Sequence, residues 1–488
     1  MRSVHITWRN ATISTLISCA ALAGVAATAS AQGATSPPPM TVSISTVTVG
    51  SLNNASVWVI PFYNNIYQTQ ASCNAALSAL LANPSATPDP QVQKETIIPG
   101  NCMEVGGVPY TYNVGETEVT TEQWVAFLYT VDPLGRNRHR LWDVAESPKV
   151  WPKYGSVERN LKAPVGQRYA VASKQWANKP YNSADFTRAA RFINSLQNGK
   201  VLSKTTKTVT TETDSSLIIT TFKARLSPIT ETGQYTMSKL AATRNSAKGF
   251  VVTSQNEWIK AAYFDPKGGG TFSYWDYPTN PGTLVNCPVD ASGCAAGGQP
   301  SATTLNSTTG AVTNAGTQPL ATYIASPNVP NSAPNWCPPQ FSAAQCARVP
   351  TNSPLNYTGN VSSVGQALTR SPWGTLDQGG NVVEITDTIA PPPAAGNNKI
   401  VWRRWHGGVV TATAYQMWIS GRCDAADHPR LRHQPVPRVP RRGPRALMSS
   451  AAPRDSDGPR SIDDQAAMDS GGGISPEIPS MCMISRAR

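Results

Sequence analysis

Hydrophobic side chains recur at helical spacing in three stretches of the chain, and each stretch begins with a residue that favours a helix N-terminus. In the first, Trp124, Phe127 and Val131 fall on one helical face. The three predicted N-caps are hydroxyl side chains, Thr120, Ser183 and Ser254. Gln123 and Glu257 lie three residues after the first and third caps and complete capping boxes. The pattern therefore predicts three helices.

Strands are predicted where β-branched residues alternate with polar ones. Thr41–Val49 has this pattern, Ala55–Phe62 is a second apolar run, and a short helix-like stretch follows around Ala75–Leu81. The segment 32–102 is thus either a strand addition to a main domain or a small cap. Threonine alternates with valine, isoleucine and phenylalanine across Val201–Thr236, which predicts a hairpin insertion at 201–236.

The first 31 residues have the pattern of a secretory signal peptide. Arg2 and Arg9 supply positive charge, an apolar small-residue run follows, and Ala29-Ser-Ala31 is a cleavage-site sequence. The rival interpretation is an uncleaved anchor. No later run reaches the roughly 18 apolar residues that a spanning helix needs. We therefore expect a secreted or periplasmic protein without a membrane span.

Composition and charge narrow the class of protein further. Only 14% of the residues are charged, and glycine and proline number 36 and 41. This composition suits a loop-rich exported protein better than a helical cytosolic enzyme. The net charge is +12, but the basic residues are scattered until the tail and form no stripe with aromatic residues. The sequence therefore predicts no nucleic-acid partner.

Nine cysteines are present, and one of them lies in the signal peptide. Export permits disulfides, although spacing cannot fix their connectivity. The candidate pairs are Cys73 with Cys102, Cys287 with Cys294, and Cys337 with Cys346. A zinc site is not favoured, because no pair of cysteines has the CxxC spacing and no histidine lies near them.

A glycine-rich loop at 374–384 carries a carboxylate near each end, Asp377 and Glu384. Gly379 and Gly380 widen the allowed backbone dihedrals, so carbonyl oxygens between the two acids can point inward. Oxygen ligands on a flexible backbone suit a hard cation such as calcium. A tight turn that leads into a strand explains the same residues. Both interpretations remain open from the residue types alone.

Seven motifs along the chain occur in the order found in one family. They are at 115–124, 179–186, 253–263, 274–279, 355–357, 371–384 and 405–408. On these motifs the region 103–423 resembles the formylglycine-generating enzyme, or sulfatase-modifying-factor, family in its exported bacterial branch. The resemblance implies an α+β class with an irregular C-type-lectin-like fold and little regular secondary structure.

The resemblance also implies a structural calcium ion at the glycine-rich loop. The side chains of Asp377 and Glu384 and the carbonyls of Gly380 and Val382 would be the ligands. A second calcium site of the family would involve two residues of this chain, Asn356 and Tyr357, but the matching acidic partner is missing.

The founding activity of this family oxidises a sulfatase cysteine to formylglycine and uses two cysteines to bind copper. The corresponding positions here are Ala412 and Met417, so no thiolate pair exists for Cu(I) and copper is not expected. We therefore expect a non-catalytic binding or structural module with a protein or glycan partner. The alternatives are an active formylglycine-generating oxidoreductase or a related metal enzyme with unrecognised ligands.

Two further segments stand apart from the family pattern. The insertion at 281–354 is rich in small polar residues and holds four cysteines, so it is a second candidate for partner binding. The tail at 424–488 is rich in arginine and proline where the family has a Gly-Phe-Arg-Val strand. An out-of-frame tail, a disordered extension and a basic arm for an anionic partner are the three interpretations of it.

Overall fold

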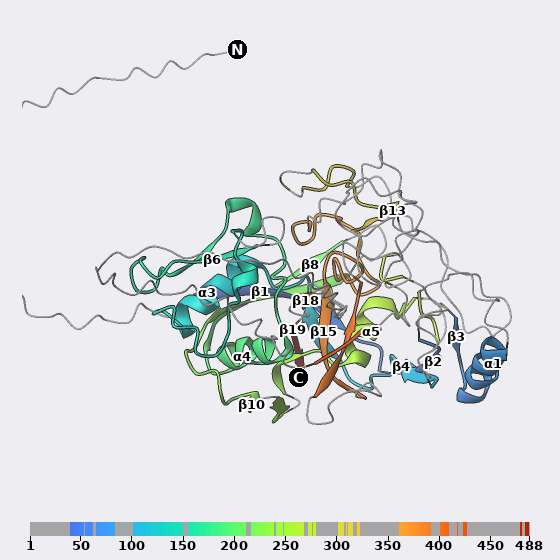
Figure 1. The fold of residues 1–488 in the computed structure, drawn as a ribbon. Coiled ribbons are helices and arrows are strands. Elements are labelled where there is room, and N and C mark those ends of the chain that lie inside the picture. Colours follow the sequence, from blue (N-terminus) through green and yellow to red (C-terminus); the bar gives the residue numbers. More distant parts are fainter. Residues whose placement is uncertain are drawn as a thin grey trace, which may run out of the picture. The chain divides into compact units, whose positions relative to one another are not determined.

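The computed structural model describes residues 40–82, 101–149, 155–210, 216–267, 272–279, 301–322, 361–391 and 401–408, apart from short gaps, together with Met417 and strands at 423–426, 479–480 and 484–487. Mixed sheets with few helices make up these residues, so the fold is an irregular α+β arrangement (Figure 1). The predicted signal peptide lies outside the described residues. None of the described helices is long and apolar enough to cross a membrane.

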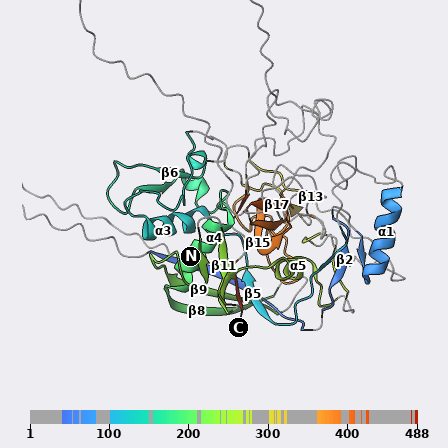
Figure 2. The ribbon, with the colours of Figure 1, turned by 60° about the horizontal axis from the view of Figure 1, so that its bottom comes forward.

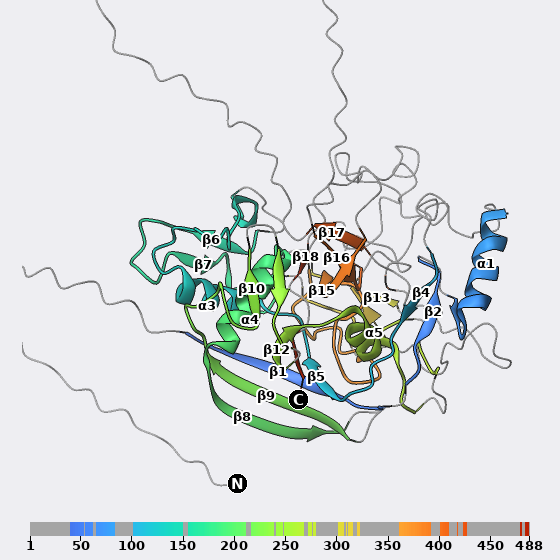
Figure 3. The same cartoon turned by 90° about the horizontal axis from the view of Figure 1, so that it is seen from below.

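The largest sheet has six strands in the order β12-β19-β5-β1-β9-β8. Its strands are β1 (Thr41–Val49), β5 (Tyr112–Gly115), β8 (Lys200–Val209), β9 (Leu217–Arg225), β12 (Gly249–Val252) and β19 (Ile484–Ala487). Neighbouring strands are antiparallel throughout, and β1, β9 and β8 run side by side in Figure 3. β1 has the bounds that its threonine and valine pattern predicts, and it pairs with both β5 and β9. β8 and β9 form the predicted hairpin.

The remaining sheets are small. One contains β2 (Val57–Val59), β3 (Ile66–Tyr67) and β4 (Met103–Val105), in the order β3-β2-β4. Another contains β15 (Val383–Ala390), β16 (Trp402–His406), β17 (Cys423–Ala426) and β18 (Pro479–Ser480), in the order β17-β16-β15-β18. The pairs are β6 (Val157–Arg159) with β7 (Tyr169–Val171), β10 (Tyr235–Met237) with β11 (Ala242–Arg244), and β13 (Ser301–Ala302) with β14 (Leu320–Ala321).

All three predicted helices form, and two of them begin as predicted. α3 (Thr121–Val131) and α5 (Gln255–Tyr263) each have a complete capping box at the N-terminus. The prediction of Ser183 as the third cap is wrong. α4 (Phe186–Gln197) is capped by Asp185, whose carboxylate accepts a 2.8 Å hydrogen bond from the backbone N–H of Arg188. A carboxylate directly before the first helical residue satisfies the first turn as well as a hydroxyl does.

One more helix and two short 3-10 turns complete the described helical elements. α1 (Gln70–Ala82) covers the helix-like stretch seen in the sequence, and there are two 3-10 turns, η2 (Val144–Glu146) and η3 (Lys174–Trp176). Cys73 of α1 forms a disulfide with Cys102, which confirms that predicted pair. The other four candidate cysteines, Cys287, Cys294, Cys337 and Cys346, lie outside the described residues.

The core is aromatic where α3 and α4 meet. Trp124 stacks on Tyr181 with ring centroids 4.1 Å apart, and Phe127 and Phe192 meet edge to face at 5.3 Å. All four side chains are buried. α5 lies beside β15 (Figure 2). This contact brings the helix that begins at the third motif against the strand that follows the glycine-rich loop.

Candidate functional site

The glycine-rich loop at 374–384 is held in a left-handed backbone at several positions. Asp377, Gly380 and Asn381 have φ values of 59°, 84° and 58°. The backbone N–H of Asn381 donates a 2.7 Å hydrogen bond to the carbonyl of Thr322. Asp377 and Asn381 are among the residues that tolerate this region best after glycine. A hydrogen bond to a residue outside the loop thus holds this backbone conformation in place.

The two central glycines are needed for different reasons. At Gly380 an added Cβ would lie 2.4 Å from the carbonyl oxygen of Thr322, and the positive φ disfavours any other residue. Gly379 is not in the left-handed region. A Cβ there would lie 3.0 Å from the ring of Pro278 and 3.4 Å from Sδ of Met417. The expected relaxation of the backbone therefore applies to Gly380, while Gly379 allows close packing.

Glu384 lies in the buried first half of β15 and is fully inaccessible to solvent. Its Oε2 accepts a hydrogen bond from the indole Nε1 of Trp258 in α5. The Trp258 ring also stacks on His406, with centroids 5.0 Å apart, and the Trp258 carbonyl accepts a 3.2 Å hydrogen bond from Gln378. Trp258 therefore links the middle of the loop and its C-terminal end to α5.

Glu118 is a functional candidate that the sequence did not single out. Acids beside a helix start are usually solvated, but Glu118 is only 1% exposed. Its Oε1 accepts a 3.2 Å hydrogen bond from Asn381, and its Oε2 has no hydrogen-bond partner among the described residues. Burial, and then repulsion from Asp377 and Glu384, raise the pKa of Glu118 well above its ordinary value. The three acids thus form one electrostatic cluster, which we call the acidic cluster.

Asp377 is the second perturbed member of the acidic cluster. Its Oδ2 accepts a hydrogen bond from the backbone N–H of Gly365. Burial raises the pKa of Asp377 to about 6, although this hydrogen bond opposes the shift. Charged carboxylates in an enclosed place repel one another unless a proton or a cation joins them. The cluster therefore favours uptake of positive charge.

The residues present fit a cation only in part. Among the described residues, no group of three or more histidine, cysteine, aspartate or glutamate side chains has the arrangement of a metal site. The predicted calcium set needs two carboxylates, Asp377 and Glu384, and two backbone carbonyls, and the donor types suit calcium. Glu118 belongs to the same cluster, and its Oε2, which has no hydrogen-bond partner among the described residues, favours a bound cation. Asn356 and Tyr357 of the second predicted site lie outside the described residues.

Of the two positions that the resemblance assigns to copper-binding cysteines, Ala412 lies outside the described residues and Met417 is fully buried. The hydroxyl of Tyr263 donates a 2.8 Å hydrogen bond to the Met417 carbonyl. Met417 thus packs between α5 and the glycine-rich loop, since its sulfur is also close to Gly379. A thioether in this setting is a core side chain.

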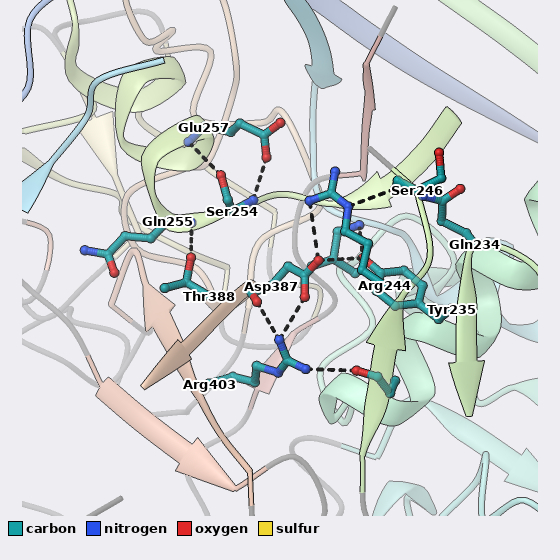
Figure 4. A network of polar contacts seen from close by, with 12 residues as sticks. Gln234, Tyr235, Arg244, Ser246, Ser254, Gln255, Glu257, Asp387, Thr388 and Arg403 are labelled. Carbon is teal, nitrogen blue, oxygen red and sulfur yellow. Dashed lines mark hydrogen bonds and ion pairs between the residues drawn. The ribbon is translucent and has the colours of Figure 1, made fainter. Parts of the chain in front are cut away.

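A second group of buried polar and charged residues is centred on the carboxylate of Asp387 in β15 (Figure 4). Arg403 donates a 2.8 Å hydrogen bond to its Oδ1, while Arg244 and the Tyr235 hydroxyl approach its Oδ2 at 3.4 Å and 3.1 Å. Burial outweighs the two arginines and raises the pKa of Asp387. Arg403 also lies 3.8 Å from the centroid of the Phe186 ring. The three charged residues lie on three strands, β11, β15 and β16, so no local pattern indicates them.

This second group borders a cavity of about 340 Å³. Its described lining contains no cysteine or histidine, and its only acid, Asp387, is already paired with two arginines. Both carboxylate oxygens of Asp387 already accept hydrogen bonds, Oδ1 from Arg403 and Oδ2 from Arg244 and Tyr235. The arrangement therefore serves to join β15 and β16 to β10 and β11.

The sequence matches no family model and no curated protein. Among solved structures, one described as the crystal structure of CarF has 13% identity and a TM-score of 0.30, with 80% of this chain and 93% of that chain covered. Treponema denticola variable protein 1 has 16% identity and a TM-score of 0.30, with 79% and 94% covered. At this TM-score neither likeness bears on function.

Proposed function

We propose that the protein is an exported, non-catalytic binding or structural module of the formylglycine-generating-enzyme-like family, with an irregular C-type-lectin-like fold. The observation that carries the proposal is Met417. It stands where the family resemblance places a copper-binding cysteine. It is fully buried, and it packs against the glycine-rich loop at 374–384. A thioether cannot supply the thiolate that Cu(I) and cysteine oxidation require.

In this proposal the acidic cluster holds a calcium ion that stabilises loops. Asp377 and Glu384 would supply side-chain oxygens, and Gly380 and Val382 would supply carbonyls. Bound calcium would offset the repulsion that raises the pKa of Glu118. The ion would contribute folding free energy, because it binds the folded state and not the unfolded chain. It would take part in no chemical step.

The test is incubation of the mature protein with copper and a cysteine-containing sulfatase peptide, followed by mass spectrometry of the peptide. We expect the peptide mass to stay unchanged, while an active formylglycine-generating enzyme converts the same peptide in a parallel sample. Conversion of the peptide by this protein would refute the proposal and establish the oxidoreductase alternative.

A further inference from the structure

A cleft of about 960 Å³ lies against the large sheet, away from the acidic cluster. Its lining includes Thr206 of β8 and Thr220 and Phe222 of β9, together with Gln197 at the C-terminal end of α4 and Ser246, Lys248 and Gly249. The hairpin of β8 and β9, whose course Figure 3 shows, therefore supplies many of the lining residues. A cleft of this size is at the upper end of ligand sites in proteins, which is more than a single small anion needs.

The charge in the cleft has one sign. Lys204 and Lys248 line it, and no aspartate or glutamate does so among the described residues. Neither ammonium forms an ion pair with any carboxylate that the structure describes. Lys204 lies 5.9 Å from the centroid of the Phe222 ring. Two unneutralised cations in one cleft attract an anionic ligand.

Neutral polar residues make up most of the remaining lining. The hydroxyls of Thr206 and Thr220 lie 3.2 Å apart, and Thr48 donates a 2.8 Å hydrogen bond to Oδ1 of Asn113. The amide N–H groups of Asn113 have no acceptor in the described part of the chain. Rows of hydroxyls and side-chain amides match the alternating donors and acceptors of sugar hydroxyls.

Apolar surface completes the lining. Ile218 is 42% exposed, Phe222 is buried, and both line the cleft. A sugar ring has apolar C–H faces that can cover such surface while its hydroxyls form hydrogen bonds with the polar lining residues. A phosphate or sulfate ion would use only the lysines. The combination of volume, amides and apolar lining therefore favours a sugar chain with negative charge.

We propose that this cleft binds an acidic oligosaccharide that contains uronic acid, with its carboxylates at Lys204 and Lys248. The proposal rests on the binding role proposed above and names its ligand class. It does not depend on the calcium ion, because the acidic cluster and the cleft share no residue. Failure to bind uronate would leave the peptide result unaffected, so the two proposals can fail separately.

The experiment is isothermal titration of the mature protein with trigalacturonic acid, its methyl-esterified neutral form, and inorganic phosphate. The variants are Lys204→Gln and Lys248→Gln, and the matched control is Lys223→Gln. Lys223 is an exposed lysine of the same hairpin that does not line the cleft. Melting temperatures show whether each variant folds.

We expect trigalacturonic acid to bind, the neutral ester to bind more weakly, and each cleft variant to lose about tenfold or more in affinity, as loss of one charged hydrogen bond implies. K223Q should bind like the unmodified protein. Absence of uronate binding, equal affinity for phosphate, or equal losses in K223Q would each overturn the proposal.

Discussion

Replacing Trp258 with phenylalanine removes the indole donor that holds Glu384 at the end of the glycine-rich loop. The acceptor is fully buried, so the lost donor is not replaced by bulk water. A hydrogen bond to a charged group contributes about 1.5–3 kcal/mol, which sets the size of the expected loss. The smaller phenylalanine ring also loses packing contacts, and this loss of stability must be separated from the loss of the hydrogen bond.

Trp124→Phe provides that separation within the same chain. Trp124 is as buried as Trp258, and it also stacks on a ring, that of Tyr181. Its Nε1 has no hydrogen-bond partner among the described residues. Both substitutions remove the same atoms from a buried site, so the difference between them reports the hydrogen bond to Glu384.

The assay is urea unfolding followed by far-UV circular dichroism, which does not depend on tryptophan emission. We expect W258F to lose about 1.5–3 kcal/mol more free energy of unfolding than W124F. Equal losses, or a larger loss in W124F, would refute the conclusion that Trp258 anchors the loop through Glu384.

Two other substitutions test the glycine-rich loop and the helix core. Gly380→Ala should lower the free energy of unfolding by at least about 2 kcal/mol, because φ is positive and the new Cβ meets the Thr322 carbonyl; a loss below about 0.5 kcal/mol would contradict the loop geometry. Burial raises the pKa of Glu146 from 4.5 to about 7, so the folded protein keeps a proton that the unfolded chain releases. Stability should therefore fall as pH rises through this window, and Glu146→Gln should reduce that slope in melting-temperature measurements, whereas an unchanged slope would oppose it.

Local signals predicted the helices and the first disulfide. The capping boxes at Thr120 and Ser254 use residues three positions apart, so sequence spacing shows them directly. The choice between Ser183 and Asp185 was not predictable in this way, because both are good caps two residues apart. Cys73 and Cys102 are 29 residues apart and pair across one segment.

The buried charges were beyond sequence reasoning because they are assembled by long-range contacts. Glu118 meets Asn381 across 263 positions. Its burial depends on how α3 and the glycine-rich loop pack, and a glutamate beside a helix start has no local mark of it. Arg244 and Arg403 likewise reach Asp387 only because β10, β11, β15 and β16 come together. The resemblance indicated Asp377 and Glu384, but not the third acid between them.

The most direct test of the account is the melting temperature of the mature protein in calcium and in a calcium chelator, with Glu384→Gln as the comparison. If the acidic cluster binds calcium, a concentration a hundredfold above the dissociation constant adds about 2.7 kcal/mol to the free energy of unfolding. We therefore predict a clear rise in the melting temperature of the unmodified protein and little change in E384Q. An identical melting temperature of the unmodified protein in calcium and in chelator would contradict the calcium site.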